Sequence, residues 1–580
     1  MIYYNIFLEQ PRRGKTREAL ITPHKQSAVW GPKHLTLICF LLGLAVSLFG
    51  QNPTPTCYRV YLSDKNNSPY SINNPLEYLS QRAIDKRTRF NIPITEQDFP
   101  INPQYKQQIL ALDSLMQPLA VSKWMNTFTV YCPDSTVVPQ ILDLPFVDSI
   151  LAVGNYDLQA PSETQSLEPR LPMVYNFDSE TKNESDYGEG FTQIAMHNGH
   201  LLHEEGFRGE GMLIVVIDNG WVGIDGLSYY QELVSSNRFL GKYSLVPDCY
   251  GEGWHGASVT SVMAANSVGS MIGTAPAANY AFIQSENPDS EELIEEDFWA
   301  NAAEIADSLG ADVVTSSLYY YSSPDFPQAN FTFTELDGTH SIASRCATTL
   351  VEKGVVVSVC AGNEGSFSWY YIGHPADAFD ILCVGGCYAD SIHDEYSSHG
   401  YTADGRVKPD VTAMSRDVMT YGFTPNGSEG PWTSNGTSYA TPIIGGLSAC
   451  LWQAMPQYTS SEIMQIVRES GHLYNNPDAD FGYGIPDFYK AYTTHVGIND
   501  YKPLRLSVYP NPATDKLFLT NHDGDIRSIS IYNAAGQLVL QHAVNGNPLI
   551  EINVTSLPKG FYVGTATMES NRTATFKFVK

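Results

Sequence analysis

The sequence predicts an α/β protein whose central part is a parallel sheet with helices on both faces. A small α+β unit precedes this part and an antiparallel β-sandwich follows it. Continuous apolar runs alternate with helical stretches in the middle of the chain, and short strands repeat between turn residues near its C-terminal end. The chain has 580 residues, too many for one core, and its 43% hydrophobic and 17% charged residues are typical of folded domains.

The first 50 residues are predicted to be an extension followed by a secretory signal peptide. Residues 35–49 are apolar throughout, and the polar residues 51–56 that follow disfavour the alternative of a buried helix. A membrane-spanning helix needs about 20 apolar residues, so this run of 15 is too short to be one. We therefore expect the protein to leave the cytoplasm.

Residues 51–155 are predicted to form the small α+β unit. An alternating strand covers 57–62, and Asn74 and Pro75 suit the start of a helix over 75–85. The pattern further predicts a strand at 124–131, a short helix at 137–142 and a strand at 146–153.

A polar stretch at 156–186 has no hydrophobic period and is predicted to be an exposed linker where proteolytic processing occurs. The central domain, 187–495, contains apolar strand-like runs at 212–217, 312–315 and 355–359 and helical stretches at 258–265, 298–309 and 341–353. The β-sandwich is expected over 503–580. Its strands are predicted at 505–509, 516–519, 528–532, 537–540, 550–554 and 561–567.

The net charge and the cysteine content of the chain restrict the ligands and partners that we expect for it. The 34 Lys and Arg against 62 Asp and Glu give a net charge of −28, which argues against nucleic acid and against charge-driven binding to anionic lipid. Of the nine cysteines, Cys39 lies in the signal segment, and the pairing of the other eight is open. Cys360 and Cys383 lie in apolar runs and are expected to be small buried side chains. No Cys-x-x-Cys pair occurs, so zinc is not expected.

Four short motifs carry the chemistry. Asp218 ends a buried strand (VVIDNG, 215–220), where ligands bind in open α/β sheets. His255 begins a helix rich in small residues (GWHGASV, 253–259), and Asn363 follows another buried strand between glycines (VCAGNEG, 359–365). Ser438 lies at the start of a long apolar helix (NGTSYATP, 435–442), where free N–H groups stabilise negative charge.

Each motif alone also has an ordinary structural interpretation. Asp218 and Asn363 suit turns, a lone histidine is usually structural, and a serine at a helix start is a common cap. The order Asp, His, Asn, Ser, with each residue at a strand end or a helix start, is much more specific than any one of them.

With these motifs, residues 187–493 resemble the catalytic domain of the subtilisin-like serine proteases. Further matching stretches lie at 206–211, 273–278, 408–413 and 482–487. The resemblance implies that Ser438 attacks a peptide carbonyl, that His255 transfers the proton and that Asp218 orients the imidazole. It implies that Asn363 and the backbone N–H of Ser438 stabilise the oxyanion, that the substrates are proteins or peptides, and that catalysis needs no cofactor.

The resemblance also suggests a substrate-binding segment and a metal. Ser317, Leu318 and Tyr319 match the strand that pairs with the substrate backbone, but Tyr319 stands where the family usually has glycine, so no side-chain preference is predicted. Relatives often bind structural calcium, and the acidic stretch 286–297 is a candidate. We favour a solvated loop and an acidic first helical turn for this stretch.

The flanking units resemble known accessory domains. The unit at 51–155 resembles the inhibitory pro-domains of this family, which implies an intramolecular inhibitor removed within the linker. The unit at 503–580 resembles the sorting domains of type IX secretion substrates, with matching stretches at 508–513, 531–537 and 557–563. This implies the secretion machinery as a partner and an extracellular or surface-attached product.

The favoured interpretation is therefore a secreted serine endopeptidase made as a zymogen. The alternatives are a catalytically inactive subtilisin-like domain that binds peptides at the surface, and an adhesin that binds through its β-sandwich. A serine-carboxyl peptidase, which shares the Gly-Thr-Ser motif, is disfavoured because His255 stands in the order that the first family requires.

Overall fold

The computed structural model describes residues 55–155, 184–495 and 506–580, apart from short gaps at 248–252, 327–329, 424–426, 522–525, 534–535, 545–548 and 569–572. These residues form two compact units, one ending at Tyr492 and the other beginning at Thr493. The predicted signal peptide and most of the predicted linker lie outside the described residues. The last linker positions belong to a short helix, α5 (Glu184–Tyr187), which begins the central domain.

The N-terminal part of the larger unit is an antiparallel sheet with the strand order β2-β3-β1-β4. Successive side chains of a strand point to opposite faces, so Val60 packs with α3 and α4, whereas Arg59 points toward the central domain. The strands are β1 (Cys57–Leu62), β2 (Gln117–Ser122), β3 (Thr127–Tyr131) and β4 (Val147–Gly154), and the helices are α3 (Pro103–Leu110) and α4 (Val138–Leu142).

Two predictions for this part were wrong in their bounds. The helix predicted at 75–85 is a single 3-10 turn, Pro75–Glu77, followed by a separate helix, α2 (Gln81–Arg89). The second helix begins where it does because the Ser80 side chain accepts a hydrogen bond from the Ala83 N–H. The strand predicted from residue 124 begins at Thr127, because a turn with Asn126 at a positive φ of 53° precedes it.

The central domain contains a seven-stranded, fully parallel sheet with the order β13-β12-β11-β10-β5-β9-β6. The three predicted apolar runs are β5, β10 and β11, whose residues are all buried. The strands are β5 (Leu213–Asp218), β6 (Phe239–Ser244), β9 (Asn279–Gln284), β10 (Val313–Ser316), β11 (Val356–Cys360), β12 (Leu382–Cys387) and β13 (Val411–Met414).

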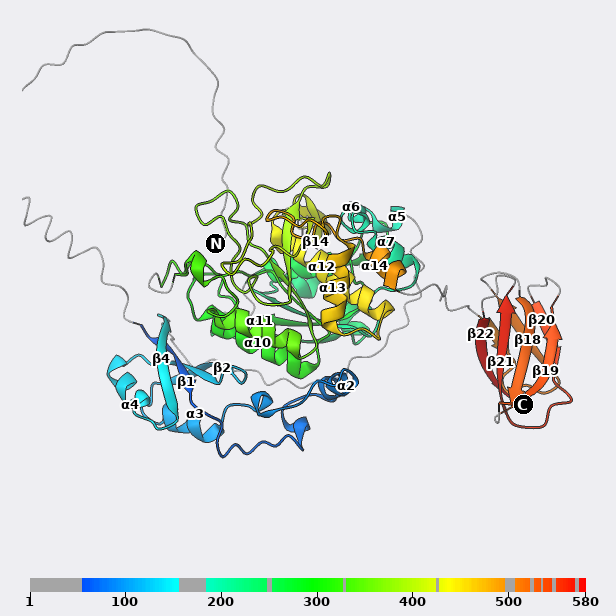
Figure 1. The fold of residues 1–580 in the computed structure, drawn as a ribbon, viewed down its shortest axis with the longest axis horizontal. Helices are drawn as coiled ribbons and strands as arrows, with labels where there is room; N and C mark the ends of the chain where they lie inside the picture. The colour runs from blue at the N-terminus through cyan, green and yellow to red at the C-terminus, as the bar shows by residue number, and fades with distance from the viewer. Residues whose placement is uncertain are drawn as a thin grey trace, which may run out of the picture. The chain divides into compact units, whose positions relative to one another are not determined.

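Helices cover both faces of this sheet, as predicted. Helix α9 (His255–Ala264) packs against α12 (Thr437–Ala454) on one face. On the other face α10 (Glu295–Leu309) packs against α11 (Ile342–Glu352), and α10 also contacts β2 of the N-terminal sheet (Figure 1). Helix α10 is therefore enclosed between two sheets.

The expectation for 286–297 is confirmed for the acidic first helical turn and for the loop at 286–291, which is at least partly exposed, but residues 292–297 are buried. Glu295, Glu296 and Asp297 do form an acidic first turn of α10, but all three are buried. Two of them have buried partners: the Arg59 guanidinium donates two hydrogen bonds to the Asp297 carboxylate, and the Ser341 hydroxyl donates to Glu296. The partners come from other segments, so the local charge pattern did not reveal the burial.

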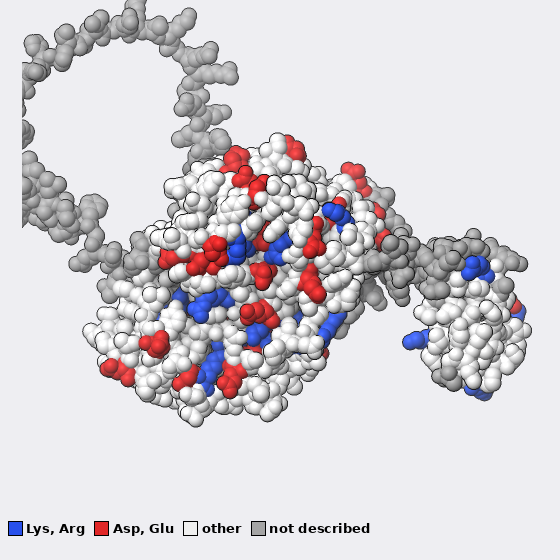
Figure 2. All heavy atoms as spheres, viewed as in Figure 1, with Lys and Arg blue, Asp and Glu red and all other residues white. Residues whose placement is uncertain are grey.

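The seven cysteines among the described residues are all buried, which confirms the expectation for Cys360 and Cys383. No helix in the described part of the chain is long and apolar enough to cross a membrane. On the face drawn in Figure 2, acidic and basic side chains are interspersed over the larger unit rather than gathered by sign.

The smaller unit is an antiparallel β-sandwich, as predicted. One sheet has the order β16-β17-β20 and the other β19-β18-β21-β22, and their inner faces share a core that includes Leu517, Ile529 and Phe578. The prediction missed the last strand. The strands are β16 (Leu506–Tyr509), β17 (Lys516–Asn521), β18 (Ile526–Asn533), β19 (Leu538–Ala543), β20 (Leu549–Asn553), β21 (Phe561–Met568) and β22 (Thr573–Val579).

Candidate active site

Asp218 and His255 meet at the carboxyl edge of the parallel sheet. Asp218 is the last residue of β5 and is fully buried, and His255 is the first residue of α9. Nδ1 of His255 lies 2.8 Å from Oδ1 of Asp218, which also accepts the backbone N–H of Asn219. The helix start can approach the strand end this closely because Gly256 has no side chain: a Cβ there would lie 2.6 Å from the carbonyl oxygen of Gly220.

The electrostatic environment favours a charged imidazole. Burial lowers the pKa of His255, but the negative charge of Asp218 and the hydrogen bond to it outweigh burial, so the pKa is raised above 6.5. A fifth of the His255 side chain stays exposed, so the ring can reach both its acidic partner and a molecule in solvent.

Ser438 is the second residue of α12, at the N-terminal end of a long buried helix. Its hydroxyl donates a 3.4 Å hydrogen bond to the carbonyl oxygen of Ser317, and no hydrogen bond joins it to the His255 ring in the described structure. The two residues are nevertheless neighbours, since the His255 ring lies 5.7 Å from the ring of Tyr439, the next residue along α12. Gly436 precedes the helix at a φ of 129°, a conformation that favours glycine.

Asn363 lies just after β11 and is oriented by the start of α12. Its side-chain oxygen accepts hydrogen bonds from the Thr437 backbone N–H, at 2.9 Å, and from the Thr437 hydroxyl, at 3.1 Å. The oxygen is held in this way, so the amide N–H groups of Asn363 remain as its donors, and the residue lines the cleft.

The predicted substrate-binding segment also borders the cleft. The Ser317 hydroxyl donates to the carbonyl oxygen of Ser438 at 2.7 Å, and Leu318 is buried. The Tyr319 ring fits beside Gly362 and Gly373, where a Cβ on either glycine would approach it to 3.0 Å. Its hydroxyl donates to Glu364, so the ring forms part of the wall.

These residues surround a single cleft of about 470 Å³, with Asp218 buried beneath it. The sequence analysis singled out the acidic stretch 286–297 but did not predict that it borders the cleft. None of the described lining residues is Lys or Arg, whereas five are acidic: Glu286, Asp289, Glu291, Asp325 and Glu364. Four of the five fall after β9 or after β10, that is, in loops at the carboxyl edge of the sheet, which is the signal that could have located them.

Crowding among these carboxyl groups affects their protonation. Glu286, Glu291 and Glu295 each have a carboxylate oxygen within 4.8 Å of the others. Burial, together with the charge of Glu291, raises the pKa of Glu286 well above 4.5, and burial with the charge of Glu286 does the same for Glu295. Three carboxylates are fewer than the six to eight oxygen ligands that Ca²⁺ takes, so the structure does not test this stretch as a candidate calcium site.

A second Asp–His–Ser cluster lies elsewhere in the central domain. The Ser344 hydroxyl and the Asp377 carboxylate both lie within hydrogen-bond distance of the same atom, Nδ1 of His374, at 3.1 and 2.9 Å. All three side chains are fully buried. A buried serine that shares one ring nitrogen with the acid has neither substrate access nor the proton path of a triad.

The N-terminal sheet contacts the central domain close to this cleft. Glu304 of α10 accepts hydrogen bonds from the backbone N–H groups of Lys123 and Trp124, and Arg87 binds Asp307 in a buried ion pair. At the end of β4 the Asn155 N–H donates to Glu292, the neighbour of the cleft residue Glu291. The chain therefore leaves the N-terminal sheet at the rim of the cleft.

Comparison with known families gives three consecutive matches. Residues 57–168 match the peptidase S8 propeptide domain of Bacteroidota, residues 209–484 match the subtilase family, and residues 507–580 match the secretion system C-terminal sorting domain. The sorting domain indicates type IX secretion, so the protein is exported to the cell surface or beyond.

The individual relatives each match about half of the chain. Subtilisin E of Bacillus subtilis (strain 168) is 29% identical over 303 residues, which cover 51% of this chain and 68% of that protein. Subtilisin of Bacillus pumilus is 29% identical over 304 residues, which cover 51% of this chain and 95% of that protein. Among solved structures, MycP1 from Mycobacterium smegmatis has 19% sequence identity and a TM-score of 0.41, covering 60% of this chain and 97% of that one. The chain thus contains a subtilase domain between a peptidase S8 propeptide domain and a secretion system C-terminal sorting domain.

Proposed function

We propose that the protein is a secreted serine endopeptidase that hydrolyses peptide bonds through Ser438, His255 and Asp218. One observation carries the proposal: a buried Asp218 carboxylate holds Nδ1 of His255 at 2.8 Å, at a cleft that Ser438 and Asn363 also line. An aspartate in this position keeps the imidazole in the tautomer that accepts a proton at Nε2 and stabilises the ring once it is charged.

In this proposal the Ser438 hydroxyl turns about its Cα–Cβ bond from the Ser317 carbonyl toward the imidazole. Such a change is consistent with a free enzyme, where catalytic hydrogen bonds are often long and tighten only with substrate. The oxygen of Ser438 then bonds to the peptide carbonyl carbon while His255 takes the hydroxyl proton. His255 gives this proton to the leaving amine as the C–N bond breaks, and water hydrolyses the resulting acyl-enzyme.

Asn363 would stabilise the negative oxygen of the tetrahedral intermediate. Its side-chain oxygen is occupied by Thr437, so an amide N–H is available as a donor, and the start of α12 adds the positive end of a helix dipole. These donors are held in place before the reaction, so little reorganisation is needed as charge develops.

We further propose that the propeptide domain inhibits the cleft until it is removed. Its sheet contacts α10 through buried polar contacts, and its last strand exits beside Glu292, next to the cleft. Cleavage between the propeptide and central domains would then release the enzyme.

The acidic lining favours cationic substrates. A Lys or Arg side chain beside Glu286 and Glu291 would relieve the repulsion that raises the pKa of Glu286, whereas an acidic side chain would add to it. We therefore infer that peptides with basic side chains near the scissile bond are the better substrates.

Labelling with a fluorophosphonate probe tests the catalytic assignment, because the probe reacts only with an activated serine. We expect the processed wild-type protein to be labelled and to cleave a peptide library, and Ser438→Ala to do neither. Ser344→Ala is the matched control, since it removes the serine of the second Asp–His–Ser cluster and should leave labelling intact. Labelling that survives in Ser438→Ala would overturn the assignment.

The main alternative is an inactive, peptide-binding subtilase. The contact of the Ser438 hydroxyl with Ser317 instead of His255 favours it. A fully processed wild-type protein that binds peptides in the cleft but takes up no probe would establish this alternative.

A further inference from the structure

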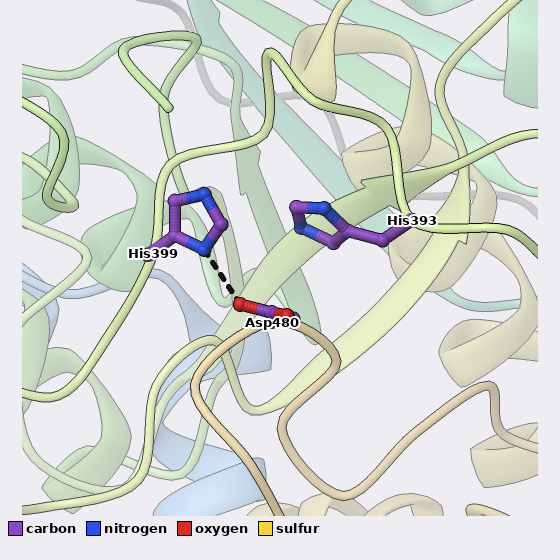
Figure 3. Close-up of side chains that lie close together, drawn as sticks. All are labelled: His393, His399 and Asp480. Atoms are coloured by element: carbon purple, nitrogen blue, oxygen red, sulfur yellow. Dashed lines mark hydrogen bonds and ion pairs between the residues drawn. The ribbon is translucent and has the colours of Figure 1, made fainter. Parts of the chain in front are cut away.

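Three potential metal ligands from two separate segments converge outside the catalytic cleft. His393 and His399 lie in the segment after β12, and Asp480 lies in a turn between α13 (Ser460–Ser470) and α14 (Phe488–His495). One ligand atom of each residue lies within 4.8 Å of the other two (Figure 3). The His399 Nδ1 and Asp480 Oδ1 atoms are only 2.7 Å apart.

His393 is a member of this cluster with an unsatisfied ring nitrogen. Its Nε2 atom is buried and has no hydrogen-bond partner among the described residues, and the ring faces the other two side chains in Figure 3. A buried polar atom without a partner destabilises the folded state, so a partner at this position would stabilise the fold. A cation between the three side chains would satisfy the nitrogen.

The surroundings hold the ligands in position. The Tyr370 ring stacks on His399 with centroids 4.2 Å apart, and Phe481 packs edge-on against His393. The Asp478 carboxylate accepts the backbone N–H groups of Asp480 and Phe481, which fixes the turn that presents Asp480. Half of the Asp480 side chain is exposed, which gives an ion a path from solvent.

We propose that His393, His399 and Asp480 bind a divalent transition-metal ion of the zinc class, with water completing the coordination. Two imidazoles and a carboxylate suit Zn²⁺ and its neighbours, whereas Ca²⁺ and Mg²⁺ prefer sets made only of oxygen. Because Zn–N and Zn–O bonds are about 2.0–2.2 Å long, the ion draws the three ligand atoms closer together. The sequence did not lead us to expect zinc, because that expectation considered only Cys-x-x-Cys pairs and this site contains no cysteine.

Metal binding at this site would stabilise the segment that carries Asn363. Ser398, next to the ligand His399, donates its backbone N–H to the Gly362 carbonyl at 3.0 Å, and its hydroxyl accepts the Glu364 N–H at 3.0 Å. Both contacted residues flank Asn363. A metal that ties His399 to Asp480 therefore stiffens the support of the cleft wall.

Metal titration of the full chain carrying Ser438→Ala, which prevents self-cleavage, tests the site independently of catalysis. After treatment with a chelator, we expect one equivalent of Zn²⁺ to bind and to raise the thermal unfolding midpoint. We expect Co²⁺ to give the visible absorption of a low-symmetry site with nitrogen ligands. Asp480→Asn and His393→Gln should each weaken Zn²⁺ binding at least about tenfold, or about 1.4 kcal/mol.

His340→Ala is the matched control, because His340 also pairs with an aspartate, Asp337, but belongs to no such cluster. It should bind Zn²⁺ as the parent does. The proposal fails if the parent binds no Zn²⁺ or if both ligand variants bind it unchanged. Should a variant not fold, the Co²⁺ spectrum of the parent decides, and its absence also overturns the proposal.

Discussion

At the scale of single residues, the cleft depends on side chains that are each fixed by one further partner. Asp218 fixes His255 through Nδ1, and Thr437 fixes Asn363 through its side-chain oxygen. In both cases the fixed atom is the one that the proposed chemistry does not use, so the reactive atom remains available.

Asn363→Leu should lower kcat about 10²–10³-fold with little change in KM, because it removes a donor that acts only on the developing oxyanion. Steady-state kinetics of the processed enzyme on one peptide substrate measures this. Thr437→Val is the companion variant: it removes one of the two contacts on the Asn363 oxygen and should have a much smaller effect. A loss confined to KM would contradict the oxyanion role.

The pH profile should reflect the raised pKa of His255. The ring must be neutral to accept the Ser438 proton, and the Asp218 charge keeps it protonated to higher pH than usual. We therefore expect kcat/KM to rise with pH through a midpoint above 6.5. Asp218→Asn removes the charge, so it should move the midpoint downward and reduce kcat by about 10⁴-fold. A midpoint at or below 6.5 in the wild type would contradict this account.

At the scale of elements, helix α10 packs against both the central domain and the propeptide domain. One side packs against α11 and the central sheet, and its acidic groups receive the propeptide. Asp297 in its first turn accepts both the Arg59 guanidinium and the Thr129 hydroxyl from neighbouring strands of the propeptide sheet. Removal of the propeptide would expose these carboxylates to water.

Arg59→Met in the Ser438→Ala chain should destabilise the docked propeptide by about 3–5 kcal/mol, because it leaves the Asp297 charge buried without its cation. Equilibrium denaturant unfolding measures the loss. Adding Asp297→Asn should recover part of it, since the second change removes the uncompensated charge.

Lys242→Met provides the control for this prediction. Lys242 lies 3.6 Å from Asp225, whose side chain is 71% exposed, so its loss should cost no more than about 1 kcal/mol. Equal costs for the buried and exposed pairs would show that the Arg59 contact does not hold the propeptide.

At the scale of the whole molecule, the chain has a net charge of −28, and the described lining of the cleft is also acidic, with no Lys or Arg. Such a field raises the local concentration of cationic ligands and weakens with ionic strength. Substrate choice is therefore expected to depend on salt, whereas the covalent chemistry is not.

Peptides with Lys near the scissile bond should be cleaved about tenfold better, by kcat/KM, than matched peptides with Glu, and the ratio should fall at high salt. Competition between the paired peptides in one reaction measures the ratio directly. Glu291→Gln should reduce it, and Asp225→Asn, which neutralises an acid that is not among the cleft-lining residues, should not. A ratio that salt leaves unchanged would mean that contact shape, not charge, sets the preference.

The sequence by itself determined the family, the layered α/β architecture, the C-terminal sandwich and the four residues now found around or beneath one cleft. This was feasible because buried parallel strands are continuous apolar runs, and the chemical groups directly follow them or begin the next helix. Local patterns predicted the bounds of helices less well where a single side chain sets a helix start. Ser80, for example, begins a new helix within the one that was predicted.

Only the tertiary structure decided which charges are buried and which distant residues meet. The sequence predicted Asp297 as part of an acidic helical turn but not its burial, because its partner, Arg59, lies 238 residues away and no local period encodes such a contact. His399 and Asp480 are 81 residues apart, and the acidic side chains around the cleft also come from separate segments. In both cases the tertiary fold brings together residues that are distant in the sequence. Burial is a property of the assembled layers, so it becomes visible only when the sheets and helices have packed.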